Sequence, residues 1–197
     1  MAMGDKLNDR FTLLLRHIAP DLPGCGDPII TQELHKAAAE FMRIAKAWRE
    51  TLTLGDIEDD TSFKVAQSDG YRARAETMWV KIDGVEIPRQ FYRLDFPSSA
   101  GEAQTLTILD PYDAVESGEV TAKVLWIPTF DAGDMPEWAI DSFSGGFINI
   151  TRGRAMMMPK KPWSDFPAGK EYLRLGQAEA MRARSEADRN DPTEFET

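Results

Sequence analysis

The single cysteine and the two histidines are the residues of this chain best suited to covalent catalysis. Cys25 lies between glycines in the stretch DLPGCGDPII, where a loop could present its thiol to a substrate. A nucleophilic thiol needs a nearby base, and His17 and His35 are the only imidazoles in the sequence. No known nucleophile motif surrounds Cys25, and an unpaired cysteine is often buried as a small apolar residue. We therefore interpret Cys25 as structural and predict that the chain is not an enzyme.

Residue types that bind metals or phosphate form no recognisable motif either. Zinc sites use about four ligands, which is more than one cysteine and two histidines supply. The acidic run at residues 58–60 lacks the spacing of a calcium loop and is typical of a solvated turn. Neither GEAQ nor SGGF follows a strand and opens a helix in a phosphate-binding pattern. We expect no metal and no cofactor.

The formal net charge of −10 limits the partners that the protein can bind. A surface of this charge repels DNA phosphates, so it does not wrap nucleic acid but allows DNA to pass without adhering. A single cysteine cannot form an internal disulfide, which is typical of a reducing cytoplasm. The first residues, MAMGDKLNDRF, lack the apolar core of a signal peptide, and no apolar run is long enough to cross a bilayer. We expect synthesis in the cytoplasm and no membrane partner.

Residues 1–50 show the periodicity of two amphipathic helices. The first helix ends before Pro20, and its apolar residues recur at helical steps: Phe11, Leu14, Leu15 and Ile18. After a proline- and glycine-rich elbow, Asp27 is a candidate N-cap and Pro28 falls at the first helical position. The apolar stripe of the second helix consists of Ile30, Leu34, Ala37, Phe41, Ala45 and Trp48.

Residues 51–130 change to the period of two that is typical of β-strands. Strand patterns occur in SFKVAQ, RARAETMWVKI, FYRLDF, AQTLTILD and EVTAKVLWIPTF. Turn sequences separate them at residues 68–70, 83–84, 97–101 and 116–118. The Asp83-Gly84 pair between VKI and VEI gives the strongest signal for a tight hairpin. We expect a small antiparallel sheet or sandwich.

Helical patterning returns after residue 130. A helix near Pro136, with Asp134 as a candidate cap, carries a broad apolar face: Trp138, Ile140, Phe143, Phe147, Ile150 and Met157. The Gly145-Gly146 pair costs about 1 kcal/mol per glycine relative to alanine, which indicates a kink or the close approach of another backbone. A second elbow, MMMPKKPWSDFP, precedes a charged helix over residues 168–189 with small residues on one side: Gly176, Ala180, Ala183 and Ala187.

This order of elements predicts an α+β fold in two parts. Residues 1–50 and 131–189 supply helices that are each amphipathic, so we expect them to pack together as one helical bundle. Residues 51–130 form an inserted antiparallel β module. Residues 190–197 have no periodicity and form an extended C-terminal tail.

Two segments share the pattern of a proline-rich elbow joined to helices. The first is LPGCGDPII followed by LHKAAAEFMRIAKAWRE, and the second runs from MPEWAIDSFSGGF to MMMPKKPWSD. Their order and spacing around the β region resemble the head–tail connector, or adaptor, proteins of tailed bacteriophages. Gly26 stands where the family pattern has proline, and the Gly145-Gly146 pair is unusual for that helix.

The resemblance implies a structural protein of the virion neck. Adaptors of this type assemble as homo-oligomeric rings, commonly dodecamers, under the portal, and they join the DNA-filled head to the tail for genome ejection. The implied partners are further copies of the chain, the portal protein, a downstream tail or nozzle protein, and DNA that passes through the lumen without sequence-specific binding. A charge of −10 per copy would make that channel acidic.

Within this interpretation, the helical bundle forms the ring and the elbows have separate roles. Candidate portal-interface residues occupy the second elbow and the tail: Pro159, Lys160, Lys161, Pro162, Trp163, Phe166 and Phe195. The first elbow is structural, through Pro23, Gly24, Cys25, Asp27 and Pro28. Two interpretations of Trp163 stay open, because a loop tryptophan either pins an elbow to its bundle or anchors a partner.

An alternative function is that of a phage tail accessory or host-recognition protein whose β module binds a ligand or carbohydrate. Aromatic residues of the strands would then line the site: Trp79, Tyr92 and Trp126. Core packing is the simpler explanation for tryptophans in periodic segments, namely Trp48, Trp79, Trp126 and Trp138. Assembly separates the two functions, because a carbohydrate-binding module would bind glycan without the portal.

Overall fold

The computed structural model describes residues 4–57, 61–65, 73–95, 103–109, 117–128 and 135–191, and the side chains of residues 4–9 and of Phe11 lie outside this described part. In these ranges, α-helices and antiparallel sheets form an α+β fold, which confirms the predicted class. The chain divides into two compact units. The helical unit comprises Met1–Ala47 and Pro128–Thr197, and the β unit comprises Trp48–Ile127.

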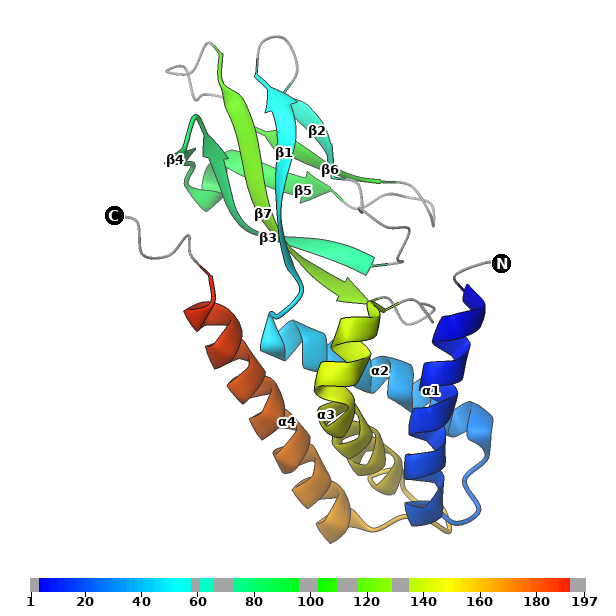
Figure 1. Cartoon of the computed structure of the whole chain (residues 1–197). Coiled ribbons are helices and arrows are strands. Elements are labelled where there is room, and N and C mark those ends of the chain that lie inside the picture. Colours follow the sequence, from blue (N-terminus) through cyan, green and yellow to red (C-terminus); the bar gives the residue numbers. More distant parts are fainter. Residues whose placement is uncertain are drawn as a thin grey trace. The chain divides into compact units, whose positions relative to one another are not determined.

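The helical unit combines helices from both halves of the chain (Figure 1). Its α-helices are α1 (Gly4–Ile18), α2 (Asp27–Ala45), α3 (Glu137–Met156) and α4 (Phe166–Arg189), and a short 3-10 turn, η1 (Ala19–Asp21), follows α1. Helix α3 contacts each of the other α-helices. Its aromatic side chains pack on α2, where the ring centroid of Phe41 lies 5.1 Å from those of both Phe143 and Phe147. Helix α3 is therefore the central helix of the unit.

Ion pairs fix the direction of α1 relative to α3. The guanidinium of Arg10 pairs with Glu137 (3.3 Å) and with Asp141, both near the start of α3. Near the end of α3, Arg152 pairs with Asp21, which follows α1 (2.6 Å). The two helices therefore run parallel. Figure 1 shows α1 (blue) and α4 (orange to red) on opposite sides of α3 (yellow).

Helices α3 and α4 run antiparallel and approach closely, because glycines face one another across their contact. A Cβ atom on Gly153 would lie 2.8 Å from the carbonyl oxygen of Gly169, and one on Gly176 would lie 3.1 Å from that of Gly146. These glycines recur after two helical turns on each helix. For the Gly145-Gly146 pair the sequence predicts a kink or a close backbone approach. The backbone of Gly146 does lie close to Gly176, but a Cβ atom on Gly146 itself would meet the ring of Phe41 (2.2 Å), so the space at Gly146 is filled by a side chain.

Helix α2 ends earlier than its apolar stripe predicts. Lys46 takes the left-handed conformation (φ 48°), and its N–H donates to the carbonyl of Met42 (2.9 Å), so the helix ends at Ala45. Trp48 lies in the β unit, where its ring centroid is 6.5 Å from that of Trp126. The expected helical position of Trp48 is therefore wrong, because a local left-handed cap and packing against the β core outweigh the periodicity.

The start of α2 also differs from its prediction. Gly26, and not Asp27, is the N-cap, and it has an extended backbone and no side chain to accept a hydrogen bond. Asp27 and Pro28 occupy the first turn, where the carboxylate still interacts favourably with the helix dipole.

The two later helices begin in different ways. Pro136 is the N-cap of α3 and forms no side-chain cap, and the candidate Asp134 lies outside the described residues. Asp165 caps α4, because its Oδ1 accepts a hydrogen bond from the backbone N–H of Ala168 (3.0 Å). Helix α4 accordingly begins at Phe166, slightly before the predicted start at residue 168.

The β unit contains two sheets in the described part of the chain. Its strands are β1 (Arg49–Asp56), β2 (Ser62–Val65), β3 (Ala73–Ile82), β4 (Val85–Glu86), β5 (Tyr92–Asp95), β6 (Gln104–Ile108) and β7 (Glu119–Pro128), and η2 (Arg89–Phe91) is a 3-10 turn. One sheet has the strand order β1-β7-β3-β4 and the other has the order β2-β6-β5. The pairings β1–β7, β2–β6, β3–β4 and β5–β6 are antiparallel, as predicted.

The hairpin expected at Asp83-Gly84 is present between β3 and β4. Asp83 has φ 47° and Gly84 has φ 80°, the positive values that a two-residue type I′ turn requires. Oδ1 of Asp83 also accepts a hydrogen bond from the backbone N–H of Glu119 (2.8 Å), which ties the turn to β7. The turns expected at residues 68–70 and 97–101 lie outside the described residues.

Strand β1 has no counterpart among the predicted strands. It pairs with β7 and has a bulge between Thr53 and Gly55, where Gly55 takes a φ of 127° that favours glycine. The sequence RETLTLGD alternates weakly, but the helical stripe that ends at Trp48 reaches its start. The helical periodicity therefore masks the beginning of this strand.

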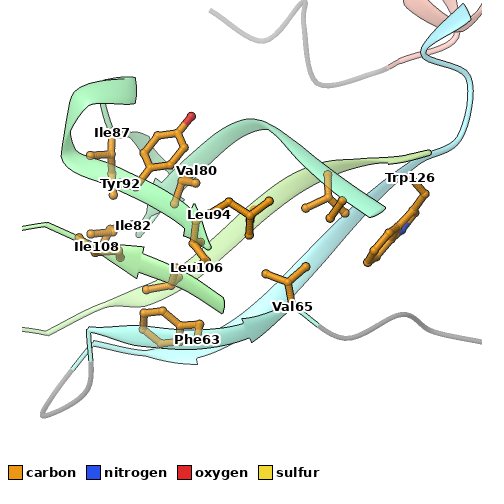
Figure 2. Packing of buried hydrophobic residues seen from close by; sticks show 14 residues of the cluster. Phe63, Val65, Val80, Ile82, Ile87, Tyr92, Leu94, Leu106, Ile108 and Trp126 are labelled. Atoms are coloured by element: carbon orange, nitrogen blue, oxygen red, sulfur yellow. The ribbon is translucent and has the colours of Figure 1, made fainter. Parts of the chain in front are cut away.

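The two sheets enclose one apolar core (Figure 2). Members of this cluster come from both sheets: Phe63, Val65, Tyr92, Leu94, Leu106 and Ile108 from one, and Val80, Ile82, Val124 and Trp126 from the other. Gln104 of β6 also spans the sheets, because its side-chain amide accepts from the N–H of Ala75 in β3 and donates to its carbonyl (3.2 Å). The predicted antiparallel sandwich thus has a continuous interior.

The negative charge of the chain is concentrated in the β unit. Residues 48–127 contain 15 acidic and 8 basic side chains, a formal charge of −7, and the rest of the chain contains 18 and 15, a formal charge of −3. The acidic character of the chain therefore belongs mainly to the β unit.

Candidate functional site

The two elbows that the sequence singles out lie at the same end of the helical unit (Figure 1). The first, residues 19–26, follows α1, and the second, residues 157–165, follows α3, which runs parallel to α1. Lys161 is close enough to Cys25 for its charge to act on the thiol. The fold therefore brings together two segments that are far apart in the sequence.

Arg152 connects the first elbow to the helices around it. Its guanidinium donates to the backbone carbonyl of His17 (2.6 Å) and pairs with Asp21 (2.6 Å). The same group lies over the ring of Tyr172 in α4, 5.5 Å from the ring centroid. One side chain of α3 thus fixes the end of α1 and the first elbow against α4.

Hydrogen bonds within the second elbow hold its backbone in one conformation. The hydroxyl of Ser164 donates to the carbonyl of Met158 and accepts from the backbone N–H of Lys161 (2.9 Å). The backbone N–H of Asp165 donates to the carbonyl of Met156 (3.1 Å). Lys160 takes the left-handed conformation (φ 59°), which few residues with a side chain adopt. These contacts present the elbow as a fixed loop.

Most of the candidate portal-interface residues are exposed on this loop. Residues 159–162 are all exposed, and so is Phe166 in the first turn of α4. Pro23 and Gly24 of the first elbow are exposed at the same end of the unit. We term these residues the elbow face: Pro23, Gly24, Pro159, Lys160, Lys161, Pro162 and Phe166. Phe195 lies outside the described residues.

Trp163 is buried, which favours the first of its two interpretations. Its exposed fraction is 9%, and the ammonium of Lys161 lies 5.9 Å from its ring centroid. Within the described ranges, no group accepts a hydrogen bond from its Nε1–H, so its contribution is apolar packing. This burial supports the interpretation that Trp163 pins the elbow to the helices, and we do not include Trp163 in the elbow face.

Cys25 is half-buried in a setting that disfavours the thiolate. Burial raises the pKa of the Cys25 thiol above its ordinary value, and the carboxylates of Asp27 and Glu33 raise this pKa further, whereas Lys161 lowers it. A thiol that stays protonated is a weak nucleophile. This environment supports the structural interpretation of Cys25 in the first elbow.

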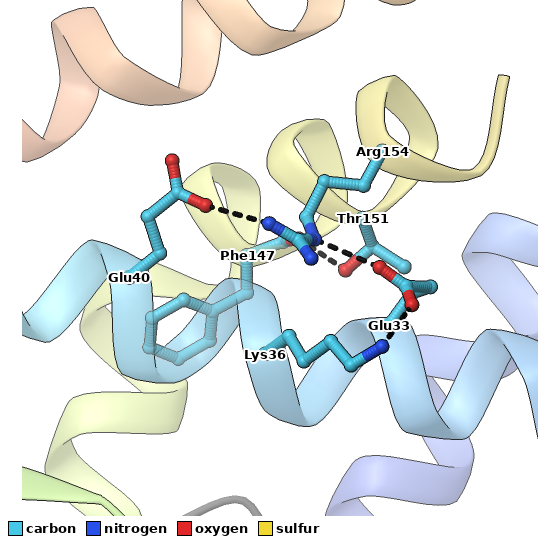
Figure 3. Close-up of polar contacts among 6 residues, drawn as sticks. All are labelled: Glu33, Lys36, Glu40, Phe147, Thr151 and Arg154. Atoms are coloured by element: carbon cyan, nitrogen blue, oxygen red, sulfur yellow. Dashed lines mark hydrogen bonds and ion pairs between the residues drawn. The ribbon is translucent and has the colours of Figure 1, made fainter. Parts of the chain in front are cut away.

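A buried carboxylate network joins α2 to α3 (Figure 3). Glu33 of α2 has an exposed fraction of 4%, and it accepts hydrogen bonds from Lys36 (2.6 Å) and from Arg154 of α3 (2.8 Å). Arg154 also pairs with Glu40 (3.1 Å). Burial by itself raises the pKa of Glu33, but the two cationic donors outweigh it and hold this pKa below its ordinary value. Sequence reasoning missed the network, because the Glu33–Arg154 contact spans 121 residues.

The aromatic residues of the alternative ligand site lie mainly in the β core. Tyr92 and Trp126 are buried, and Nε1 of Trp126 donates to the carboxylate of Glu50 (2.6 Å). Trp79 is half-buried, with the ammonium of Lys81 4.7 Å from its ring centroid. Because most of this aromatic surface is internal, these three residues do not line a surface site together.

Apart from Phe166, the large exposed apolar residues of the helical unit belong to no predicted site. Trp138 is 46% exposed, so its expected core position is wrong: it lies in the first turn of α3 at the edge of the ring cluster, where it contacts Phe143 (6.0 Å between centroids). Leu13 of α1 is 52% exposed, and Met181 of α4 is 58% exposed. Helical periodicity identifies an apolar face but does not tell whether the same chain or a partner covers it.

Among the described residues, no group of three or more His, Cys, Asp or Glu side chains could hold a metal ion. No helix in the same ranges is long and apolar enough to span a membrane. No protein-family model matches the chain, and a search of curated proteins finds no match. The case for a function therefore depends on the residues and contacts described above.

Proposed function

We propose that the chain is a structural virion protein, a head-to-tail adaptor that forms a ring under the portal, joins capsid to tail and provides an acidic channel for DNA. The observation that supports this most directly is the meeting of the two elbows. The segments that resemble adaptor proteins are separated in sequence by the β unit, yet both lie at one end of the helical unit. That end presents an exposed surface with Lys160, Lys161 and Phe166.

The helical unit has the properties of a ring-forming body. Its central helix is fixed to α4 through close glycine contacts and to α1 and α2 through ion pairs of Arg10 and Arg154. Such a body can repeat around a ring without changing shape. A twelvefold symmetry of the ring is proposed only because the chain resembles adaptor proteins.

The β unit supplies most of the charge that an acidic channel needs. Its formal charge of −7 is repeated in every copy of a ring, so the summed potential repels the phosphates of DNA in transit. The chain would then let DNA pass in either direction without sequence-specific contacts.

Binding to the portal tests the proposal. The full-length chain is mixed with the purified portal protein of the same virus, and the complex is measured by co-sedimentation. We expect Lys160→Glu and Lys161→Glu to weaken binding about tenfold each, because both change a charge on the elbow face. Lys64→Glu, an exposed lysine of β2, is the matched control and should bind as the wild type does.

Two further results bear on the proposal. If deletion of residues 190–197 leaves portal binding undiminished, the tail is not part of the portal interface. That result would leave the assignment of the elbow face to this interface unchanged. A chain that stays monomeric and never associates with the portal contradicts the adaptor function altogether. Saturable glycan binding in the same preparation would favour the host-recognition alternative.

A further inference from the structure

Exposed apolar residues form two different faces on the helical unit. On α4, Leu175, Ala178 and Met181 recur at steps of three and are all exposed, on the side away from the buried glycine and alanine residues that contact α3. We term this the α4 face. On the other side of α3, the α1–α3 face contains Leu13, Trp138, Glu137 and Asp141, which are also exposed. Figure 1 shows that α1 and α4 lie on opposite sides of α3.

The two faces differ in charge. The exposed charged residues of α4 are mostly basic: Lys170, Arg174, Arg182, Arg184 and Arg189, against Glu171 and Glu186. Two of these arginines also pair within the helix, Arg174 with Glu171 and Arg184 with Asp188. At the α1–α3 face, the carboxylates of Glu137 and Asp141 share one cation, Arg10, and Arg16 lies one turn beyond Leu13. Trp138 therefore has two carboxylates beside it, whereas Met181 is followed directly by a guanidinium.

Contacts within the unit place these faces at the same height along α3. Gly176 packs at Gly146, and Gly169 packs at Gly153. Because the two helices run antiparallel, a step of one residue toward the C-terminus of α4 matches a step of one residue toward the N-terminus of α3. By this register Met181 lies level with Asp141, and Arg184 lies level with Trp138. Arg10 pairs at the same level, and Leu13 lies one turn from Arg10 on α1.

We infer that the two faces bind each other between neighbouring copies, so that the α4 face of one chain packs on the α1–α3 face of the next. The inference rests on the proposed ring and names its subunit contact. A head-to-tail contact requires two different, complementary patches on opposite sides of the subunit. When copies are related by rotation about an axis parallel to α3, residues of equal height meet. Met181 then contacts Leu13 and Trp138, and Arg182 and Arg184 pair with Glu137 and Asp141.

Chemical cross-linking tests this contact even when association is weak. Cys25 is first replaced by serine, since it is the only cysteine of the chain. Leu13→Cys and Met181→Cys are then combined in one chain, and a short bismaleimide reagent is added. We expect a ladder of dimers, trimers and larger species in a denaturing gel, because each chain is linked on both sides.

A matched control separates specific contact from random collision. Val85 is an exposed apolar residue of β4, so the combination of Leu13→Cys with Val85→Cys has two equally accessible thiols but only one at the proposed contact. We expect the Leu13–Met181 ladder to exceed the control by about tenfold, as a specific contact should. Equal ladders from both combinations, or no ladder from Leu13 and Met181, would overturn the inference.

Mixing of acidic variants gives an independent readout. Met181→Asp and Leu13→Asp each leave one face intact, so neither variant should assemble alone, but an equimolar mixture should form discrete dimers through the two intact faces. Circular dichroism confirms that both variants keep their helices. If Leu13→Asp assembles like the wild type, the α1–α3 face is not half of the contact.

These results distinguish the inference from the proposed function. If wild-type rings form and both aspartate variants also form rings, the adaptor function stands and the assigned faces are wrong. If the wild type gives neither a ring nor a ladder, even with portal present, both the function and the contact fail.

Discussion

Glu33 keeps its negative charge inside the helical unit because Lys36 and Arg154 donate hydrogen bonds to its carboxylate. These donors depress the pKa of Glu33 in the folded state below its ordinary value of 4.5, despite the opposing effect of burial. A depressed folded pKa contributes stability above the unfolded pKa, and that stability is lost as the pH falls through the folded pKa. The network therefore makes the helical unit less stable in acid.

Glu33→Gln tests this contribution. Removing the charge leaves Arg154 and Lys36 without their shared carboxylate, so we expect the free energy of unfolding at pH 7 to fall by about 1–3 kcal/mol. The loss of stability on acidification below the ordinary pKa of 4.5 should also become shallower. Urea unfolding at several pH values measures both effects.

Glu171→Gln is the matched control for this prediction. Glu171 also accepts hydrogen bonds from an arginine, Arg174, but both side chains are exposed. Its replacement should leave the free energy of unfolding at pH 7 essentially unchanged, because an exposed ion pair is screened by solvent. Equal changes in the free energy of unfolding from the two substitutions would show that the burial of Glu33 does not increase its contribution to stability.

Two tryptophans of α3 and its elbow should respond differently to truncation. Trp163 is 9% exposed and Trp138 is 46% exposed. Trp163→Ala removes a buried ring and should lower the free energy of unfolding by about 3–5 kcal/mol, whereas Trp138→Ala should cost less than about 1 kcal/mol. Thermal or urea unfolding decides the order, and a larger loss for Trp138 contradicts the pinning role of Trp163.

At the scale of the elements, the adjacent glycines of α3 have different surroundings. A Cβ atom on Gly146 would lie 2.2 Å from the ring of Phe41, which sits among packed aromatic residues. A Cβ atom on Gly145 would lie 3.1 Å from a carboxylate oxygen of Glu179, the far end of a flexible side chain. The two positions therefore differ in packing although they are neighbours in one helix.

The same substitution at these two glycines should have opposite effects. Gly146→Ala should lower the free energy of unfolding by about 1–3 kcal/mol, because overpacking exceeds the gain in helix propensity. Gly145→Ala should be neutral or should raise it by up to about 1 kcal/mol. Urea unfolding of both variants checks the pair, and destabilisation of similar size at both positions would refute the assigned packing.

The sequence predicts elements well where the determinants are local. The Asp83-Gly84 turn depends on residues within a few positions, and it is present. The end of α2 is less predictable, because Trp48 fits the helical stripe but packs with Trp126, which is distant in sequence. Strand β1 is difficult to predict for the same reason, since it pairs with β7, which begins far away in the sequence at Glu119.

In the candidate site too, local features can be predicted from the sequence, whereas features that depend on distant contacts cannot. The composition of the elbows is visible in the sequence, but their meeting depends on the parallel course of α1 and α3, which Arg10 and Arg152 fix through distant partners. The burial of Trp163 and the exposure of Trp138 also depend on packing and not on residue type. These features depend on how the four helices pack together, so they cannot be predicted from the sequence of any single element.

At the scale of the whole molecule, charge is divided unequally between the two units. The β unit has a formal charge of −7 and the helical unit has −3, so the β unit is the part that should repel DNA most strongly. We expect the full-length chain not to retard double-stranded DNA in a gel, even at an ionic strength of about 0.01 M, where screening is weak. Retardation that disappears with added salt would instead indicate a phosphate-binding surface.

Assembly is the property on which the account depends most. The proposed ring requires two different faces on each copy and a separate surface for the portal. We assign these roles to the α4 face, the α1–α3 face and the elbow face of the helical unit. The most direct measurement is electron microscopy of the full-length chain mixed with purified portal protein. We predict a closed ring of chains stacked coaxially on the portal. Single chains scattered beside unoccupied portals, even at high concentrations of both proteins, would contradict the account.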